Sequence, residues 1–475
     1  MNIILLVSDT FRYDHLGCHG NDWIDTRDLD AFARKCAVFD NCYTGSFPTI
    51  PQRTDMVTGR YIFPYAGWCP LKPDWTPVAE RLHEAGRVTQ LICDTPHLLS
   101  RDYNFHRGFD AYHWERGQEG DVSFTRMNDP IYPVMPHEKT RRDYLMRSAP
   151  KRKPGIPYQT TLADRHRWHN RHWAFEEDRF TPRTARHTVR WLEENYKCRS
   201  FFLWVDTFDA HEPWDAPEYI VRKYDPDYTG TPMIHPNYGH ASDYTAAELK
   251  NMRAHYAGEV HVVSKSLGQI IRKVEETGLM DDTAIIFTSD HGIMLGEHDM
   301  VGKCNINPED ERIWKFYREV THVPLMIYAP GIKPRRIKRV VQPVDIMPTI
   351  MELAGEKVPD GIDGRSLCRL IDGRSTSVRP YAITAGWEIH KSRTVTVQDE
   401  GWSLVAGLPD SKEKRAQWEQ QPDLPLVMEL YNTKEDPAQK KNLLKQKPQQ
   451  AQKMLKYLSS FMREHGGGQE FVLDK

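Results

Sequence analysis

The sequence lacks long apolar runs and closely spaced cysteines. No stretch approaches the ~20 apolar residues that a membrane-spanning helix needs, so we expect no membrane as a partner. The eight cysteines are scattered, without a CxxC pair or a dense framework, which is typical of reduced thiols. No basic segment followed by an apolar stretch and a small-residue cleavage site precedes the first strand-like run, so we expect no secretory signal. The sequence therefore predicts a cytoplasmic protein.

The chain also has little net charge. Its 64 basic and 66 acidic residues give a formal net charge of −2 over 475 residues. This balance gives no global reason to expect nucleic acid or an anionic membrane surface as a partner. We expect a small-molecule substrate instead, and the composition leaves a homo-oligomer open.

Two short apolar runs, far apart in the sequence, each lead to an aspartate. Residues 3–7 precede Asp9, and residues 284–288 precede Asp290, which His291 follows. Runs rich in Val and Ile are typical of buried parallel strands, and ligands of open α/β sheets gather just beyond the carboxyl ends of such strands. The pattern therefore predicts that these three side chains share one divalent cation. The alternative is that each aspartate caps a following helix.

Strand-like and helix-like segments alternate through most of the chain. The expected elements include strands at 88–93, 201–205 and 323–328 and helices at 183–196 and 252–278. This alternation predicts an α/β fold, with a mostly parallel sheet flanked by helices, over residues 1–370. Within it, residues 117–180 have little apolar periodicity, and we expect an irregular insertion near the mouth of the active site. In residues 371–475, short strand-like runs and a polar helical segment near 449–463 predict a smaller α+β subdomain with a short antiparallel sheet.

Several motifs resemble those of sulfatases in the alkaline phosphatase superfamily, and the resemblance extends over nearly the whole chain. They lie at residues 9–17, 49–53, 288–292, 296–303, 344–350 and 429–437, in the order that the family has. The resemblance implies an alkaline phosphatase-like fold. At the position of His291 many sulfatases carry Asn. The histidine resembles instead the branch of phosphonate monoester hydrolases and phosphodiesterases.

The chain departs from the sulfatase pattern at the implied nucleophile, Thr49. Sulfatases carry Cys or Ser at this position, and that residue is converted to formylglycine. Threonine is not a substrate for the conversion, so no formylglycine is expected. A hydrated formylglycine releases sulfate by collapsing to an aldehyde, whereas a group on Thr49 must be released by water attacking phosphorus or sulfur. This difference favours phosphoester over sulfate ester chemistry.

The resemblance also implies roles for individual residues. The implied metal ligands are Asp9, Asp290 and His291, with Thr10, in place of a second opening aspartate, as a weaker fourth. Mixed carboxylate and imidazole ligation suits Mn²⁺ or Zn²⁺ better than Ca²⁺. The other implied site residues are Arg53 near the nucleophile, Lys303 at the transferring group, His211 as general acid, and Thr95 and His97 at the substrate oxygens. The alternatives are a structural Arg53, a surface Lys303 and a merely buried, hydrogen-bonded His211.

These inferences together predict a metal-dependent hydrolase of phosphodiesters or phosphonate monoesters that acts through a covalent phosphothreonine at Thr49. Two alternatives stay open: a sulfatase that works without formylglycine, and a homologue with reduced catalysis that binds a phosphorylated or sulfated ligand. A second metal site, built from Asp206 or Asp209 with His211 and His390, is a further hypothesis.

Overall fold

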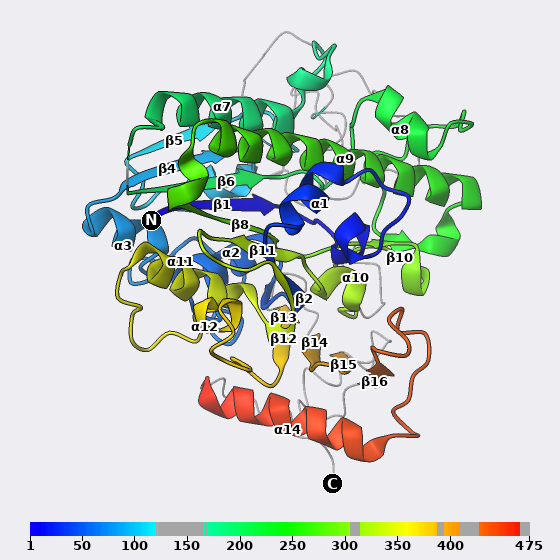
Figure 1. Cartoon of the computed structure of the whole chain (residues 1–475). Helices are drawn as coiled ribbons and strands as arrows, with labels where there is room; N and C mark the ends of the chain where they lie inside the picture. Colours follow the sequence, from blue (N-terminus) through cyan, green and yellow to red (C-terminus); the bar gives the residue numbers. More distant parts are fainter. Residues whose placement is uncertain are drawn as a thin grey trace, which may run out of the picture.

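The central element of the protein is one large β-sheet. The structure is a computed structural model that describes residues 1–119, 121, 166, 169–198, 200–304, 314–386, 394–407 and 427–465. Within these ranges the sheet has eight strands in the order β12-β2-β11-β8-β1-β6-β4-β5 (Figure 1). The strands are β1 (Asn2–Ser8), β2 (Ala37–Cys42), β4 (Val88–Cys93), β5 (Ala111–Trp114), β6 (Phe201–Thr207), β8 (Thr283–Ser289), β11 (Leu325–Tyr328) and β12 (Arg335–Val341). Only β11 runs antiparallel to its neighbours in this described sheet, so the predicted mostly parallel sheet is confirmed.

Strand β1 lies between β8 and β6 and is parallel to both. The register places Ser8 opposite Ser289 of β8 and opposite Thr207 of β6. Asp9 and Asp290, the next residues along β1 and β8, therefore leave the sheet side by side at its carboxyl edge.

Helices cover both faces of the sheet (Figure 1). They include α1 (Arg27–Ala33), α2 (Thr49–Thr58), α3 (Val78–Glu84), α7 (Phe180–Asn195), α9 (Ala246–Glu276) and α11 (Ile346–Ala354). Alternate side chains of β1 enter two hydrophobic cores: Ile4 and Leu6 join the core with α1, α7 and α9, and Leu5 joins the core with α2, α3 and α11. Burial of one such leucine contributes about 1.5–3 kcal/mol. Helix α9 begins earlier than expected, because Thr245 and Glu248 form a capping box there.

Shorter elements connect these layers. They are α4 (Pro96–Leu99), α8 (Glu218–Tyr224), α10 (Arg318–Thr321), α12 (Cys368–Ile371), and a small sheet of β7 (Gly239–His240), β10 (Met300–Gly302) and β9 (Met294–Leu295). Most of the expected insertion at 117–180 lies outside the described residues. In the described chain, no helix is both long enough and apolar enough to span a membrane.

The C-terminal part forms a second sheet. Strands β13 (Ala382–Gly386), β14 (Val395–Gln398), β15 (Trp402–Gly407) and β16 (Val427–Asn432) are antiparallel neighbours, and α14 (Pro448–Glu464) packs against the sheet (Figure 1). The expected short antiparallel sheet is thus confirmed. Its remaining strand, β3 (Ser46–Phe47), comes from the N-terminal part and pairs in parallel with β13. The domain boundary at residue 370 stays a prediction.

Helix α14 supplies a test of this packing. Its buried side chains are Ala451, Met454, Leu458 and Phe461, which share one helix face. We expect Leu458→Asp to lower the free energy of unfolding by about 3 kcal/mol or more, because it removes an apolar side chain and buries an unpaired charge. Gln452→Asp, at an exposed position of the same helix, should change it by less than about 0.5 kcal/mol. Denaturant unfolding measures both values, and equal values for the two variants would contradict this packing.

Candidate active site

The segments that follow β1 and β8 bring Asp9, Asp290 and His291 together. One ligand atom of each lies within 4.8 Å of the others, and all three side chains are buried. Nε2 of His291 lies 3.9 Å from Oδ1 of Asp9 and 3.5 Å from Oδ2 of Asp290. The expected convergence is present, and metal binding by these residues stays a prediction.

The His291 imidazole is oriented as a ligand. Its Nδ1 lies 3.1 Å from the carbonyl oxygen of Gly292, which can only accept a hydrogen bond, so Nδ1 carries the proton and Nε2 keeps its lone pair. Burial, with Lys303 and Arg53 nearby, lowers the pKa of His291 to about 3, so the ring is neutral at pH 7. Burial and the nearby Asp290 raise the pKa of Asp9 well above its ordinary value. Two crowded carboxylates and a neutral imidazole fit Mn²⁺ or Zn²⁺.

Arg53 joins three carboxylates that come from three adjacent strands. Its Nη1 donates to Asp9 at 3.0 Å and to Asp290 at 2.7 Å. Its Nε and Nη2 donate to the two carboxylate oxygens of Asp206 at 2.9 and 2.8 Å. The guanidinium is fully buried. Arg53 therefore lies near the nucleophile position, as expected, but its main partners are carboxylates and not the backbone.

Thr49 is the first residue of α2 and lies beside this cluster. Its Oγ1 is 3.4 Å from Nε2 of His291, and the residue is 2% exposed. The preceding loop is fixed by Asp55, which accepts hydrogen bonds from the amide and hydroxyl of Ser46 and from the amide of Ile62. The first turn of a helix stabilises negative charge. The hydroxyl of Thr49 therefore lies where a developing anion is favoured.

Thr10 and Lys303 form a chain of hydrogen bonds that ends at Asp9. Nζ of Lys303 donates to Oγ1 of Thr10 at 3.0 Å, and that hydroxyl donates to Oδ1 of Asp9 at 2.7 Å. The Thr10 amide donates to Asp290 at 2.9 Å. Thr10 thus orients two carboxylates, and its role as a fourth metal ligand stays a prediction. Lys303 is 5% exposed and is not a surface charge.

Thr95, His97 and His211 lie in the neighbouring segments after β4 and β6. Oγ1 of Thr95 donates to Asp206 at 2.5 Å, which connects it to the buried carboxylates. The rings of His97 and His211 flank Phe208, at centroid distances of 5.4 and 4.0 Å. Nδ1 of His211 donates to the carbonyl oxygen of Glu212 at 2.6 Å. Both histidines therefore have defined positions, and their roles toward a substrate stay predictions.

Asp206 was expected only as a candidate for a second metal. It pairs with Arg53 and Thr95, whereas Asp209 accepts from Gln118 at 2.9 Å and from Thr181 at 2.7 Å. The described part of the chain contains no group of three metal ligands that includes either aspartate, and His390 lies outside it. A sequence signal for Asp206 exists, since it is the one acidic residue within the apolar run of β6.

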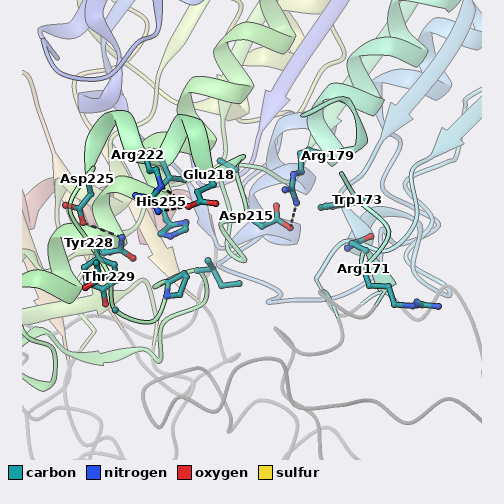
Figure 2. Close-up of a pocket in the computed structure, with 17 residues that line it drawn as sticks. Arg171, Trp173, Arg179, Asp215, Glu218, Arg222, Asp225, Tyr228, Thr229 and His255 are labelled. Carbon is teal, nitrogen blue, oxygen red and sulfur yellow. Dashed lines mark hydrogen bonds and ion pairs between the residues drawn. The ribbon is translucent and has the colours of Figure 1, made fainter. Parts of the chain in front are cut away.

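A cavity of about 810 Å³ lies between the segment that follows His211 and helices α8 and α9 (Figure 2). Its lining includes Trp173, Arg179, Asp215 and His255, and none of the predicted site residues lines it. Arg179 and Asp215 are paired at 3.6 Å (Figure 2). The Arg222–Glu218 and Lys250–Asp225 pairs, each at 2.7 Å, balance further charges of the lining. The cavity therefore gives no argument for a charged ligand.

Comparison with known proteins identifies the family. The family model described as Sulfatase matches residues 1–356, and the one described as N-sulphoglucosamine sulphohydrolase, C-terminal, matches residues 310–465. The chain belongs to the sulfatase family. The expected resemblance and the alkaline phosphatase-like fold are thus confirmed. This sulfatase-family chain is therefore a hydrolase, and enzymes of the superfamily use a divalent metal.

Relatives of this sulfatase-family chain carry different names. An arylsulfatase of Clostridium perfringens is 26% identical over 408 residues, which are 80% of each chain. The multifunctional alkaline phosphatase superfamily protein PehA of Trinickia caryophylli is 25% identical over 424 residues, 77% of this chain and 76% of that protein. The crystal structure of a phosphonate monoester hydrolase of Agrobacterium radiobacter has a TM-score of 0.71 at 22% identity, and covers 98% of this chain and 96% of its own.

Asp290→Asn should remove the metal. The amide is a weaker ligand and leaves Arg53 with one carboxylate fewer, so we expect Mn²⁺ or Zn²⁺ affinity to fall by on the order of 100-fold or more. Metal analysis after dialysis and calorimetric titration measure the change. Asp281→Asn, at an exposed position before β8, is the control and should keep the metal content of the wild type. Unchanged metal content in Asp290→Asn would remove this residue from the site.

Proposed function

We propose that this protein is a metal-dependent hydrolase of phosphodiesters or phosphonate monoesters with Thr49 as the nucleophile. The observation that carries the proposal is the hydroxyl of Thr49 at the start of α2, with Oγ1 3.4 Å from Nε2 of His291. Threonine is not converted to formylglycine, so this hydroxyl is kept. The proposal is supported by the name of the phosphonate monoester hydrolase, which shares the fold, and by that of PehA, a multifunctional protein of the alkaline phosphatase superfamily. We further propose a small-molecule ester as substrate and a cytoplasmic location.

Asp9, Asp290 and His291 would hold the divalent metal, Mn²⁺ or Zn²⁺ in preference to Ca²⁺. When bound, the metal supplies Lewis-acid chemistry that lowers the pKa of the Thr49 hydroxyl and neutralises charge on a phosphoryl oxygen. Thr10 would orient the carboxylate of Asp9. Arg53 would keep Asp9 and Asp290 in place through its two hydrogen bonds.

In this proposal, Oγ1 of Thr49 gives its proton to solvent and attacks phosphorus, and the bond between phosphorus and the leaving oxygen breaks. His211 gives the leaving oxygen its proton. Lys303 and the first turn of α2 stabilise the charge that develops on the phosphoryl group. Thr95 and His97 would contact the substrate oxygens. Water then gives a proton to His211 and attacks the phosphothreonine, the bond from phosphorus to Oγ1 breaks, and Oγ1 of Thr49 takes a proton from solvent.

A sulfatase activity without formylglycine is the second candidate. The family membership and the arylsulfatase relative favour it. Thr49 opposes it, because a sulfated threonine has no aldehyde route and must be released by attack of water on sulfur. Comparing aryl phosphodiester, phosphonate and sulfate substrates at equal metal loading separates the two candidates. A metal-loaded protein inactive on all three would indicate a homologue that only binds its ligand.

Thr49→Ala should lower kcat by about 10³-fold or more, because it removes the attacking oxygen. Metal content and thermal unfolding should stay those of the wild type. Mass spectrometry of quenched reactions should find the covalent phosphoryl adduct on the peptide that carries Thr49, and none in Thr49→Ala. Thr58→Ala, at the other end of α2, should keep the adduct. Retained turnover in Thr49→Ala would remove Thr49 from the mechanism.

His211→Ala should slow substrates according to their leaving groups. Alkyl esters need a proton on the departing oxygen, so we expect kcat to fall by about 10²–10⁴-fold for them. Nitrophenyl esters, whose leaving group departs as a stable anion, should lose much less. A plot of log kcat against leaving-group pKa measures the difference as a steeper slope. An equal loss for both ester types would contradict the role of His211 as an acid.

A further inference from the structure

A second group of metal-binding side chains lies at the edge of the main sheet. His113 is in β5, Glu115 directly follows that strand, and His187 is in α7. Nε2 of His113 lies 3.0 Å from Oε1 of Glu115, and Nε2 of His187 lies 2.9 Å from the same oxygen. One ligand atom of each lies within 4.8 Å of the others. Two separate segments of the fold, β5 with the residue after it and α7, thus direct ligand atoms to one point.

The carboxylate of Glu115 is held so that one oxygen faces the histidines. Arg183 of α7 pairs with its other oxygen, Oε2. The Glu115 amide donates to the carbonyl oxygen of Cys93 in β4 at 2.8 Å. The side chain of Glu115 is only 4% exposed. Metal ligands in proteins are commonly oriented by outer partners of this kind.

The two imidazoles lie against each other and remain partly exposed. Their ring centroids lie 3.9 Å apart, and the ring planes are tilted by 26° to each other. The side chains of His113 and His187 are 41% and 30% exposed, so an ion can reach them from solvent.

We propose that His113, Glu115 and His187 bind a zinc ion that ties β5 to α7. Two imidazoles and one carboxylate are a donor set that zinc uses, with water in the fourth position. Tetrahedral zinc with bonds of about 2.0–2.1 Å separates its ligand atoms by about 3.3 Å. The observed separations of 2.9 and 3.0 Å need to widen by only a few tenths of an ångström. The two stacked rings would turn apart so that both Nε2 atoms point at the ion.

The zinc site would stabilise an edge of the fold. In the described sheet, β5 has four residues and pairs only with β4. The segment that follows β5 carries Gln118, whose side-chain amide donates to Asp209 at 2.9 Å. Asp209 lies two residues before His211 in the sequence. Zinc at Glu115 would thus fix the beginning of a segment that supports the loop of the proposed general acid.

Counting bound zinc tests the proposal. Calorimetric titration with Zn²⁺ alone, and metal analysis after dialysis, are applied to the wild type, His187→Gln and the double variant His113→Gln/His187→Gln. We expect each variant to bind one equivalent less than the wild type. Added Zn²⁺ should also raise the Tm of the wild type more than that of the double variant, since a ligand of the folded state stabilises it. Mg²⁺ added in place of Zn²⁺ should change the Tm of the wild type and of the double variant equally, because imidazole is not its preferred ligand.

His83→Gln is the matched control. His83 also pairs with a carboxylate, with Nδ1 3.0 Å from Oδ1 of Asp110, but no second imidazole joins that pair among the described ligand groups. The variant His83→Gln should bind as much zinc as the wild type. The same one-equivalent difference is expected in the Asp290→Asn background, so the test does not depend on the proposed function. Equal zinc binding by wild type and double variant, or a loss in His83→Gln, would overturn the proposal.

Discussion

The site depends on a buried guanidinium placed among carboxylates of three adjacent strands. Arg53 contacts Asp9, Asp206 and Asp290, and all four side chains are fully buried. Removing one partner from such a buried group typically costs about 3–5 kcal/mol, because the others are left unpaired. Burial beside Asp290 raises the pKa of Asp9 even with Arg53 and Lys303 nearby, so a cation bound there would favour the ionised carboxylate of Asp9. Since Arg53 lies one turn after Thr49, the same interaction also fixes the start of α2.

Family membership and the residue at position 49 point toward different esters. The sulfatase model covers residues 1–356, yet the motif resemblance assigns Thr49 to the position that sulfatases modify. The cluster around Thr49 is built from side chains that favour metal and anion binding, whichever atom is attacked. Release of the covalent group is the step that separates the alternatives, because it depends on the nucleophile and not on the surrounding charges.

Much of the sheet and the convergence of Asp9, Asp290 and His291 could be predicted, because apolar runs mark buried strands and ligands gather at their carboxyl ends. The antiparallel direction of β11 could not, since the same apolar pattern fits either direction. A two-residue strand such as β3 has no pattern at all. The pairing of Asp206 with Arg53 could not be predicted either, because the two residues are 153 positions apart. A single aspartate in a strand gives no information about which residue it pairs with.

The pairing of β3 with β13 joins the C-terminal sheet to the loop just before Thr49. Ser46 and Phe47 lie opposite Ala385 and Gly386, and the carbonyl oxygen of Thr44 accepts hydrogen bonds from Gln342 and Thr384. The C-terminal sheet is thus part of the scaffold that positions Thr49, the proposed nucleophile. If the C-terminal sheet were exchanged for that of a relative in order to transfer its substrate preference, the turnover number would change together with that preference.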